Sequence, residues 1–273
     1  MKETFYDVHL PGNIKIALVA DIHNQKNPKV IDSLRRQKPD LILIPGDIKK
    51  GYQYEREDSL ILSETNSLEI LKACPEIADT YFSLGNHEAL IPDSDLKQIR
   101  SYGITVLDDS YIRKGDLILG GLTSNRVIAH RYYDAHYKED AAYSYSHFLK
   151  IRQSCYDDAH RSYAFLDKME QEEGYKILLN HHPEYFALCE PFLKERKIDL
   201  IVSGHAHGGQ IRFYSFRKKA WQGILSPNQG LLPQYTSGVH EGPYGRMVIT
   251  KGLANTVRPI PRLFNETEIV YIC

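Results

Sequence analysis

The sequence predicts an α/β fold, because short apolar runs alternate with amphipathic stretches along a chain of 273 residues. The first apolar run, Ile14–Ala20, is rich in β-formers and is typical of a strand in a sheet that is covered on both faces. Asn27 and Pro28 then open an amphipathic helix, which is expected to close near Pro39. Polar clusters follow several of the apolar runs, at the points where strands should end.

The remaining elements continue this alternation. Further strands are expected at Leu41–Ile44, Thr80–Leu84, Ile104–Leu107, Leu117–Leu119, Lys176–Leu179, Asp199–Val202, Met247–Thr250 and Glu268–Ile272. Helices are expected through Leu68 and Leu71 to Cys74, from near Asp93, and over Glu184–Arg196. A chain of this length fits a single domain, residues 1–273, with room for an insert.

The insert is expected at about residues 126–173, which hold neither Gly nor Pro and carry a stripe of apolar residues at helical spacing. Gly174 is a natural stop signal, so we expect one long helix or a helical pair. Seven tyrosines fall between Tyr132 and Tyr163; they either pack the insert onto the core or form an aromatic lid over a ligand. Residues 204–245, rich in Gly and Pro, are expected to form loops.

Composition excludes several classes of partner. The formal net charge is −1, which gives no footprint for nucleic acid or for a membrane surface, although the basic run from Arg212 to Lys219 remains a possible contact site. The N-terminal residues are polar, and no stretch reaches the roughly 18 apolar residues of a membrane span, so we expect no transmembrane segment. Four scattered cysteines indicate reduced thiols and a cytoplasmic protein.

Five short polar clusters carry the chemistry, and each follows an apolar run. They are Asp21-Ile22-His23, Gly46-Asp47, Gly85-Asn86-His87-Glu88, His181-His182-Pro183 and Gly204-His205-Ala206-His207. Carboxylate, imidazole and amide groups are the ligands that divalent hydrolytic metals favour. The clusters supply them in the number that two adjacent ions require, so the sequence predicts a two-metal hydrolase.

Local spacing supports this interpretation. Asp47 follows a predicted strand and Gly46, which permits a tight turn that aims the carboxylate along the strand axis, so Asp47 is placed to bridge two ions. Asp21 and His23 lie two residues apart, and both side chains can point into one cleft. The same spacing lets His205 and His207 reach one site.

The five ordered clusters resemble the signature of the calcineurin-like metallophosphoesterase superfamily, which reads D-x-H, GD, GNH(E/D), H and GHxH. The match runs from Asp21 to His207. A finer likeness links the chain to the YkuE-like bacterial branch, through Gly208-Gly209-Gln210, the pattern Pro233-x-Tyr235-x-x-Gly238 and Lys251-Gly252-Leu253. The resemblance implies a four-layer α/β/β/α sandwich with metals at the carboxyl ends of the central strands.

The resemblance also implies roles for individual residues. Asp21, His23, Asp47 and His207 would hold one divalent ion, and Asp47, Asn86, His181 and His205 would hold the second. A hydroxide between the ions would be the nucleophile. His87 would be the catalytic side chain that binds a phosphoryl oxygen or protonates the leaving group, and Glu88 would orient His87.

Two assignments in the site stay open at this stage. His181 and His182 compete for the fourth cluster; the family pattern H-x-P favours His181, with His182 in a supporting or substrate-side position. Arg212, at the start of the basic run after the last cluster, either grips an anionic group of the substrate or lies in a solvated loop. Arg258 and Arg262 are further candidates for contact with the substrate.

The expected function is metal-dependent hydrolysis of a phosphate ester, with a phosphodiester or pyrophosphate favoured over a phosphoprotein. Mn²⁺, Fe and Zn²⁺ all suit the ligands, and the substrate is a small-molecule or a lipid-linked phosphate ester. One alternative is a phosphoesterase-fold scaffold without catalysis, although every cluster is intact. Another is a nucleotide phosphodiesterase rather than a lipid-linked phosphoesterase. The sequence gives no indication of oligomeric state.

Overall fold

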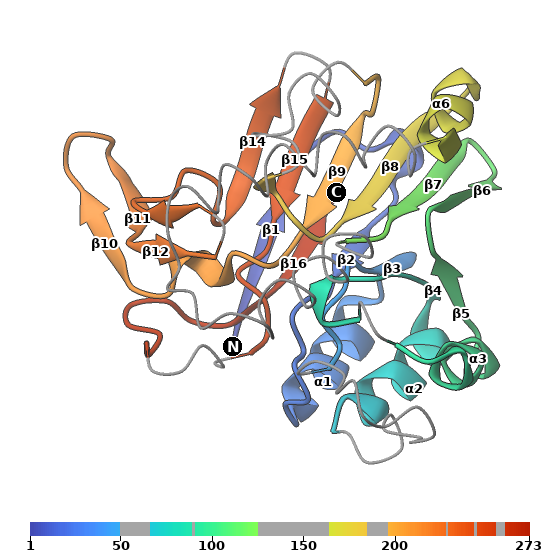
Figure 1. Cartoon of the computed structure of the whole chain (residues 1–273), viewed down its shortest axis with the longest axis horizontal. Helices are drawn as coiled ribbons and strands as arrows, with labels where there is room; N and C mark the ends of the chain where they lie inside the picture. Colours follow the sequence, from blue (N-terminus) through green and yellow to red (C-terminus); the bar gives the residue numbers. More distant parts are fainter. Residues whose placement is uncertain are drawn as a thin grey trace, which may run out of the picture.

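The computed structural model describes residues 1–49, 66–88, 91–124, 164–184, 196–227, 229–242, 245–254 and 260–273. Two six-stranded sheets form its centre (Figure 1). Helices pack on the outer face of each sheet, and the inner faces pack against each other. This is the α/β/β/α layering that the resemblance implied.

The first sheet has the strand order β1-β16-β2-β3-β4-β5. Its strands are β1 (Lys2–Tyr6), β2 (Ile16–Leu18), β3 (Leu41–Ile44), β4 (Asp79–Ser83), β5 (Ile104–Leu107) and β16 (Glu268–Ile272). β2, β3, β4 and β5 run parallel, so their carboxyl ends lie at one edge of the sheet. The loops at that edge contain the first three polar clusters.

Three helices cover the outer face of this sheet: α1 (Pro28–Gln37), α2 (Ser67–Ile77) and α3 (Asp93–Ser101) (Figure 1). Leu34 of α1, Leu71 of α2 and Ile99 of α3 are buried in one cluster with Ile42 and Ile44 of β3. Leu41 and Leu43 alternate with those isoleucines along β3 and point to the other face of the sheet. A strand buried on both faces reads as a continuous apolar run, which is why β3 was predicted correctly.

The second sheet has the strand order β14-β15-β9-β8-β7-β6. Its strands are β6 (Ser110–Lys114), β7 (Leu117–Leu122), β8 (Tyr175–Asn180), β9 (Leu200–Ser203), β14 (Gly238–Gly242) and β15 (Gly245–Ile249). Leu179 and Val202 pack against Leu41 and Leu43 of the first sheet. On the opposite face, Leu166 and Met169 of α6 (Ala164–Gln171) pack against Leu178 and Ile201.

Short strands outside the two sheets were not expected from the sequence. The chain after β9 forms β10 (Arg212–Ser215), β11 (Ala220–Gly223), β12 (Leu225–Ser226) and β13 (Gly230–Leu231), paired as two antiparallel ribbons. The prediction of loops over residues 204–245 was therefore wrong in part. In Figure 1 the β10–β11 hairpin projects from the body of the molecule. Three 3₁₀ turns complete the described elements: η1 (Pro11–Asn13), η3 (Asn86–Glu88) and η4 (His207–Gly209).

Several predictions fall outside the described residues. Most of the tyrosine-rich insert and most of the helix expected at 184–196 lie there, together with Arg258, Cys155 and Cys189. Cys74 and Cys273 are free thiols, the first buried and the second exposed. Within the described ranges, no helix combines the length and apolar character needed to cross a membrane.

Candidate metal centre

Five loops from two sheets bring the polar clusters together. Asp21 and His23 follow β2, Asp47 follows β3, and η3 with Asn86 and His87 follows β4. From the second sheet, His181 follows β8 directly and His205 and His207 follow β9. The strands β8 and β9 are parallel, as are β2, β3 and β4, so each sheet presents its carboxyl ends to the site.

Asp47 occupies the middle of the cluster. Its Oδ2 lies 3.0 Å from Nε2 of His181, 3.5 Å from Nε2 of His23 and 3.8 Å from Nε2 of His87. Its other oxygen, Oδ1, accepts a hydrogen bond of 3.0 Å from the backbone N–H of His87. One carboxylate oxygen thus faces imidazoles from three separate loops.

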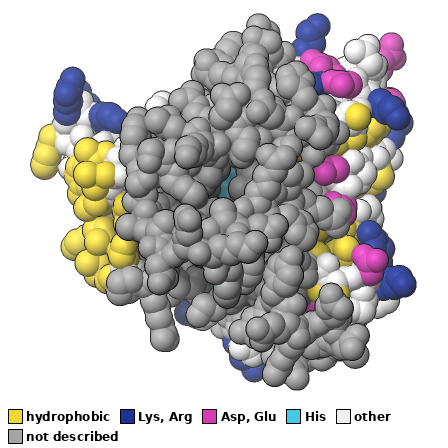
Figure 2. Space-filling model, viewed as in Figure 1, with side chains coloured by type: hydrophobic (Ala, Val, Ile, Leu, Met, Phe, Trp, Pro, Cys, Tyr) yellow, Lys and Arg dark blue, Asp and Glu magenta, His cyan; other side chains and the backbone are white. Residues whose placement is uncertain are grey.

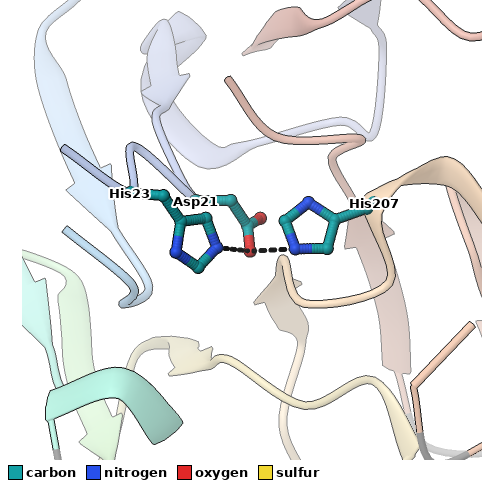
Figure 3. A group of neighbouring side chains, drawn as sticks. All are labelled: Asp21, His23 and His207. Atoms are coloured by element: carbon teal, nitrogen blue, oxygen red, sulfur yellow. Dashed lines mark ion pairs between the residues drawn. The ribbon is translucent and has the colours of Figure 1, made fainter. Parts of the chain in front are cut away.

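Asp21 forms a second focus beside it. Its Oδ1 lies 3.7 Å from Nε2 of His23 and 3.8 Å from Nε2 of His207, which approach from opposite sides (Figure 3). The backbone N–H of His205 donates to both oxygens of Asp21, at 3.1 and 3.2 Å. This contact ties the loop after β2 in the first sheet to the loop after β9 in the second.

Three groups of side chains have ligand atoms that lie within 4.8 Å of one another. They are Asp21 with His23 and His207, Asp47 with His181 and His205, and His23 with Asp47 and His87. The first two groups share no residue, and each is a buried set of one carboxylate and two imidazoles. They contain three of the four residues of each ligand set that the resemblance implied. The fourth residue is Asp47 in the first set and Asn86 in the second.

Buried polar atoms without partners test whether these residues suit a metal. In the described part of the chain, both ring nitrogens of His23, Nε2 of His181 and Oδ1 of Asn86 are buried and form no hydrogen bond. An unsatisfied buried polar atom costs about 1–3 kcal/mol, so such atoms are rarely left together without a ligand. Nitrogen and oxygen donors of this kind fit Mn²⁺, Fe or Zn²⁺.

His181 rather than His182 joins the cluster. Its Nδ1 lies 2.7 Å from the carbonyl oxygen of Pro45 and can donate to it, which leaves Nε2 free to bind a metal. The centroid of the His182 ring lies 4.0 Å from that of His205, with the rings tilted by 43°, and His182 belongs to none of the three groups. His182 therefore lies where a supporting residue would.

The charges and the burial of the cluster shift the pKa values of its members in different directions. Burial opposes ionisation of Asp21, but His207 and His23 outweigh it and lower the pKa of Asp21 to about 2. Burial likewise opposes the charged form of His181, yet Asp47 and Asp21 raise the pKa of His181 to about 9. Burial lowers the pKa of His207 to about 3, so this imidazole is neutral at pH 7. A metal that binds Nε2 of His181 must displace the proton of this imidazolium.

The backbone of the ligand loops is strained. Asp21, His23, Asp47, His205 and His207 all have positive φ angles, between 45° and 66°. Residues with a Cβ adopt this left-handed conformation at a cost, and such outliers gather at functional sites. The strain is held by close packing: a Cβ at Gly85 would overlap Oδ1 of Asp47, so a glycine is required there.

Glu88 fixes the loop that carries Asp47. Its buried carboxylate accepts hydrogen bonds from the backbone N–H groups of Asp47 at 2.8 Å, Ile48 at 2.9 Å and Gly85 at 2.8 Å. Burial, together with the charge of Asp47, raises the pKa of Glu88 to about 7. The sequence led us to expect that Glu88 orients His87; its contacts orient the Asp47 loop instead.

Arg212 lies outside the metal cluster. Its guanidinium donates hydrogen bonds to the carbonyl oxygen of Gly208 at 2.9 Å, to Oγ of Ser237 at 2.8 Å and to the carbonyl oxygen of Trp221 at 2.8 Å. These contacts hold the β10–β11 hairpin against η4. These hydrogen bonds give Arg212 a role in positioning the hairpin.

Two residues near the C-terminus support the last ligand block. Asn265 donates to the carbonyl oxygens of His207 and Gln210, at 2.8 and 2.9 Å, and so fixes η4. Nη2 of Arg262 lies 3.2 Å from Nδ1 of His207 and donates to the carbonyl oxygen of Lys251 at 2.6 Å. Sequence reasoning missed Asn265, because nothing in its local sequence distinguishes it from a surface asparagine.

Comparisons with known proteins agree with this geometry. A family model described as calcineurin-like phosphoesterase matches residues 14–209. An uncharacterized metallophosphoesterase of Helicobacter pylori is 25% identical over all of this chain and 63% of its own length. One from Campylobacter jejuni subsp. jejuni is 25% identical over 97% of this chain and 61% of its own. The chain therefore spans about three fifths of the length of these relatives.

A likeness to solved structures is weaker. The sulfate thiohydrolase SoxB of Thermus thermophilus, in complex with glycerol, is 12% identical with a TM-score of 0.44. The match covers 89% of this chain and 52% of that chain. A likeness at this level carries no argument about activity.

Proposed function

Because the chain belongs to the calcineurin-like phosphoesterase family, we propose that it is a phosphoester hydrolase that works with two divalent metal ions. The observation that carries the proposal is the pair of buried ligand groups, Asp21-His23-His207 and Asp47-His181-His205, which lie side by side with Asp47 facing both. A single ion would leave one of these carboxylate–imidazole groups without a cation.

The proposed assignment of ligands follows the geometry. Asp21, His23, Asp47 and His207 would hold one ion, and Asp47, Asn86, His181 and His205 would hold the other. When bound, two such ions would polarise a phosphoryl oxygen and would lower the pKa of water enough to supply a nucleophile at neutral pH. The identity of the metals is open, since the ligand chemistry suits Mn²⁺, Fe and Zn²⁺ alike.

His87 is the proposed catalytic side chain. It lies at the edge of the cluster with 33% of its side chain exposed, whereas the side chains of His23 and His181 are almost fully buried. Burial lowers the pKa of His87, so the ring is neutral at pH 7 and has one N–H to donate. From this position His87 would hydrogen-bond a phosphoryl oxygen or the oxygen of the leaving group.

The backbone around the ligands supplies preorganisation. Glu88 holds the N–H groups of the Asp47 loop, and Asp47 in turn accepts from the N–H of His87, so η3 and the loop after β3 move as one unit. A substrate phosphate would therefore meet His87 and the proposed ligands already in place. These groups would not have to rearrange during the reaction, which lowers the activation barrier. We favour a phosphodiester or pyrophosphate as the substrate class.

The proposal is tested by hydrolysis of bis-p-nitrophenyl phosphate and of p-nitrophenyl phosphate, first with Mn²⁺ and then with chelator. We expect chelator-sensitive turnover that favours the diester. Absence of turnover on both esters, with two ions still bound by elemental analysis, would favour a scaffold without catalysis. Turnover that resists complete removal of metal would contradict the two-metal assignment outright.

A further inference from the structure

The β10–β11 hairpin exposes large aromatic side chains. Phe216 is 86% exposed, Trp221 51%, Tyr214 42% and Phe213 37%. Phe213 and Tyr214 are neighbours on one strand and so point to opposite faces of the ribbon. Both faces of this hairpin therefore carry exposed aromatic rings, although hydrophobic residues of this size are normally buried.

The apolar surface extends beyond the hairpin. Leu232 is 60% exposed and its N–H donates to the carbonyl oxygen of Ile224 at 2.8 Å, directly after β11. Leu263 is 47% exposed and accepts at 3.0 Å from the N–H of Arg212, at the start of β10, while Phe264 beside it is 80% exposed. Figure 2 shows hydrophobic side chains gathered along this side of the molecule. A continuous exposed apolar patch indicates an interaction surface.

The outer turn of the hairpin is basic. Arg217, Lys218 and Lys219 are all exposed, and Figure 2 shows Lys and Arg side chains at the outer end of the hydrophobic surface. From Gly204 to His240 the sequence contains no Asp or Glu, whereas the whole chain has a net charge of −1. The near-neutral net charge of the whole chain is therefore compatible with a positive electrostatic potential around this hairpin.

From these features we propose that the hairpin and its apolar surroundings bind the surface of a lipid bilayer that contains anionic lipids. Aromatic rings settle at the boundary between headgroups and acyl chains, and Lys and Arg pair with anionic headgroups. A partner protein would cover one face of the ribbon, but a bilayer interface can surround aromatic rings on both faces. The projection of the hairpin from the body of the molecule suits insertion into such an interface (Figure 1).

The hairpin is attached firmly to the metal centre. Arg212 links β10 to the carbonyl oxygen of Gly208, and the N–H of Ile224 after β11 donates to the carbonyl oxygen of Gly209 at 3.1 Å. Gly208 and Gly209 belong to η4, which begins at the proposed ligand His207. Binding of the hairpin to lipid would therefore place the metal centre beside the headgroups. A lipid-borne phosphate ester as substrate follows from this placement and rests on the proposed function.

The inference is tested by co-sedimentation with vesicles of phosphatidylcholine alone and of equimolar phosphatidylcholine and phosphatidylglycerol. The wild-type chain should bind the anionic vesicles. The double variant Phe216→Ser, Trp221→Ser should weaken that binding by at least about tenfold, because two aromatic side chains would no longer be buried in the bilayer. Phe5→Ser is the matched control, since Phe5 is 51% exposed on β1 in the first sheet, and it should bind as wild type does.

The charge contribution has its own pair of variants. Arg217→Gln, Lys218→Gln and Lys219→Gln together should weaken binding to the anionic vesicles on the order of a hundredfold, at about 1 kcal/mol for each basic residue. Removing three exposed charges elsewhere, by Lys29→Gln, Arg35→Gln and Lys97→Gln, should have little effect. Asp47→Asn should bind vesicles normally, so failure of the catalytic proposal and failure of this inference are separable.

Two results would overturn the inference. One is a wild-type chain that remains in solution with both kinds of vesicle. The other is a wild-type dimer that Phe216→Ser with Trp221→Ser converts to monomer while vesicle binding stays unchanged, which would make this surface an interface between copies of the chain.

Discussion

The β10–β11 hairpin follows the last polar cluster of the metal centre in sequence, and these two regions depart from ordinary burial in opposite ways. The centre buries charged and polar groups, with Asp21 fully buried and His205 and His207 nearly so. The hairpin, which starts at Arg212, exposes Phe216 and Trp221. A polar cluster in the interior and aromatic rings on the surface are both costly for an isolated soluble domain.

The comparison shows how each cost is met. The buried cluster is stabilised within the chain by the hydrogen bonds that Glu88 and Asp21 accept from backbone N–H groups. Bound cations would complete it. On the hairpin, Tyr214 makes ring contacts with Phe216 and Trp221, and all three side chains stay exposed. The first region is organised for ligands that enter the protein, and the second for a surface outside it.

The largest expected effect is that of Asp47→Asn. Replacing the carboxylate that faces both ligand groups should loosen both ions and reduce hydrolysis of bis-p-nitrophenyl phosphate by more than about 10³-fold. Steady-state kinetics with added Mn²⁺ measures this, and Asp32→Asn on the exposed face of α1 is the control. Wild-type turnover and metal content in Asp47→Asn would refute the shared role of Asp47.

His87→Ala should have the next largest effect. We expect turnover to fall by roughly 10²–10⁴-fold, the usual contribution of a general acid, while the metal content stays at the wild-type level. Kinetics and elemental analysis of the same sample distinguish the two quantities. Loss of metal from this variant would instead make His87 a ligand.

Gly85→Ala tests the packing that supports the strained ligand loops. The added Cβ would overlap Oδ1 of Asp47 and must displace it or the loop after β3. We expect the free energy of unfolding to fall by about 1–3 kcal/mol and the affinity for Mn²⁺ to fall with it. Gly115→Ala is the control for an added Cβ, since a Cβ there meets no atom within 4 Å; Gly115, unlike Gly85, also has a positive φ. Equal metal affinity in the two variants would show that packing at Gly85 does not hold Asp47.

Arg212→Met should have the smallest effect on catalysis. Loss of three hydrogen bonds from a charged donor should lower the free energy of unfolding by about 1–3 kcal/mol, measured by denaturant titration. Turnover of the soluble diester should stay within about threefold of wild type, because Arg212 contacts no residue of the metal cluster. A loss of turnover comparable to that of His87→Ala would restore Arg212 as a substrate-binding residue.

The sequence was sufficient to predict most of the two sheets and the polar residues that the fold brings together in one cluster. Asp21, Asp47 and His181 were recognisable because each follows a continuous apolar run, and such runs are distinctive when strands are buried on both faces. Strand β1 was missed because it lies at the edge of its sheet, where Lys2 and Glu3 are polar and partly exposed.

What the sequence did not predict depends on contacts between distant residues. Glu88 was expected to act on its neighbour His87, yet it accepts from the backbone about 40 residues earlier in the chain. Similarly, the basic run after Arg212 was visible, but its position on a hairpin with exposed aromatic rings depends on β-pairing that the Gly- and Pro-rich sequence concealed. Whether Phe216 is buried or exposed is a property of the fold and not of the local sequence.

The count of bound ions tests the central claim most directly. Native mass spectrometry of the Mn²⁺-loaded chain should show two ions in the wild type. His207→Ala and His181→Ala each remove a ligand from a different group, so each should retain one ion, and Asp47→Asn should retain neither at the same Mn²⁺ concentration. A wild-type chain that holds a single ion, lost equally in all three variants, would contradict the two-metal account.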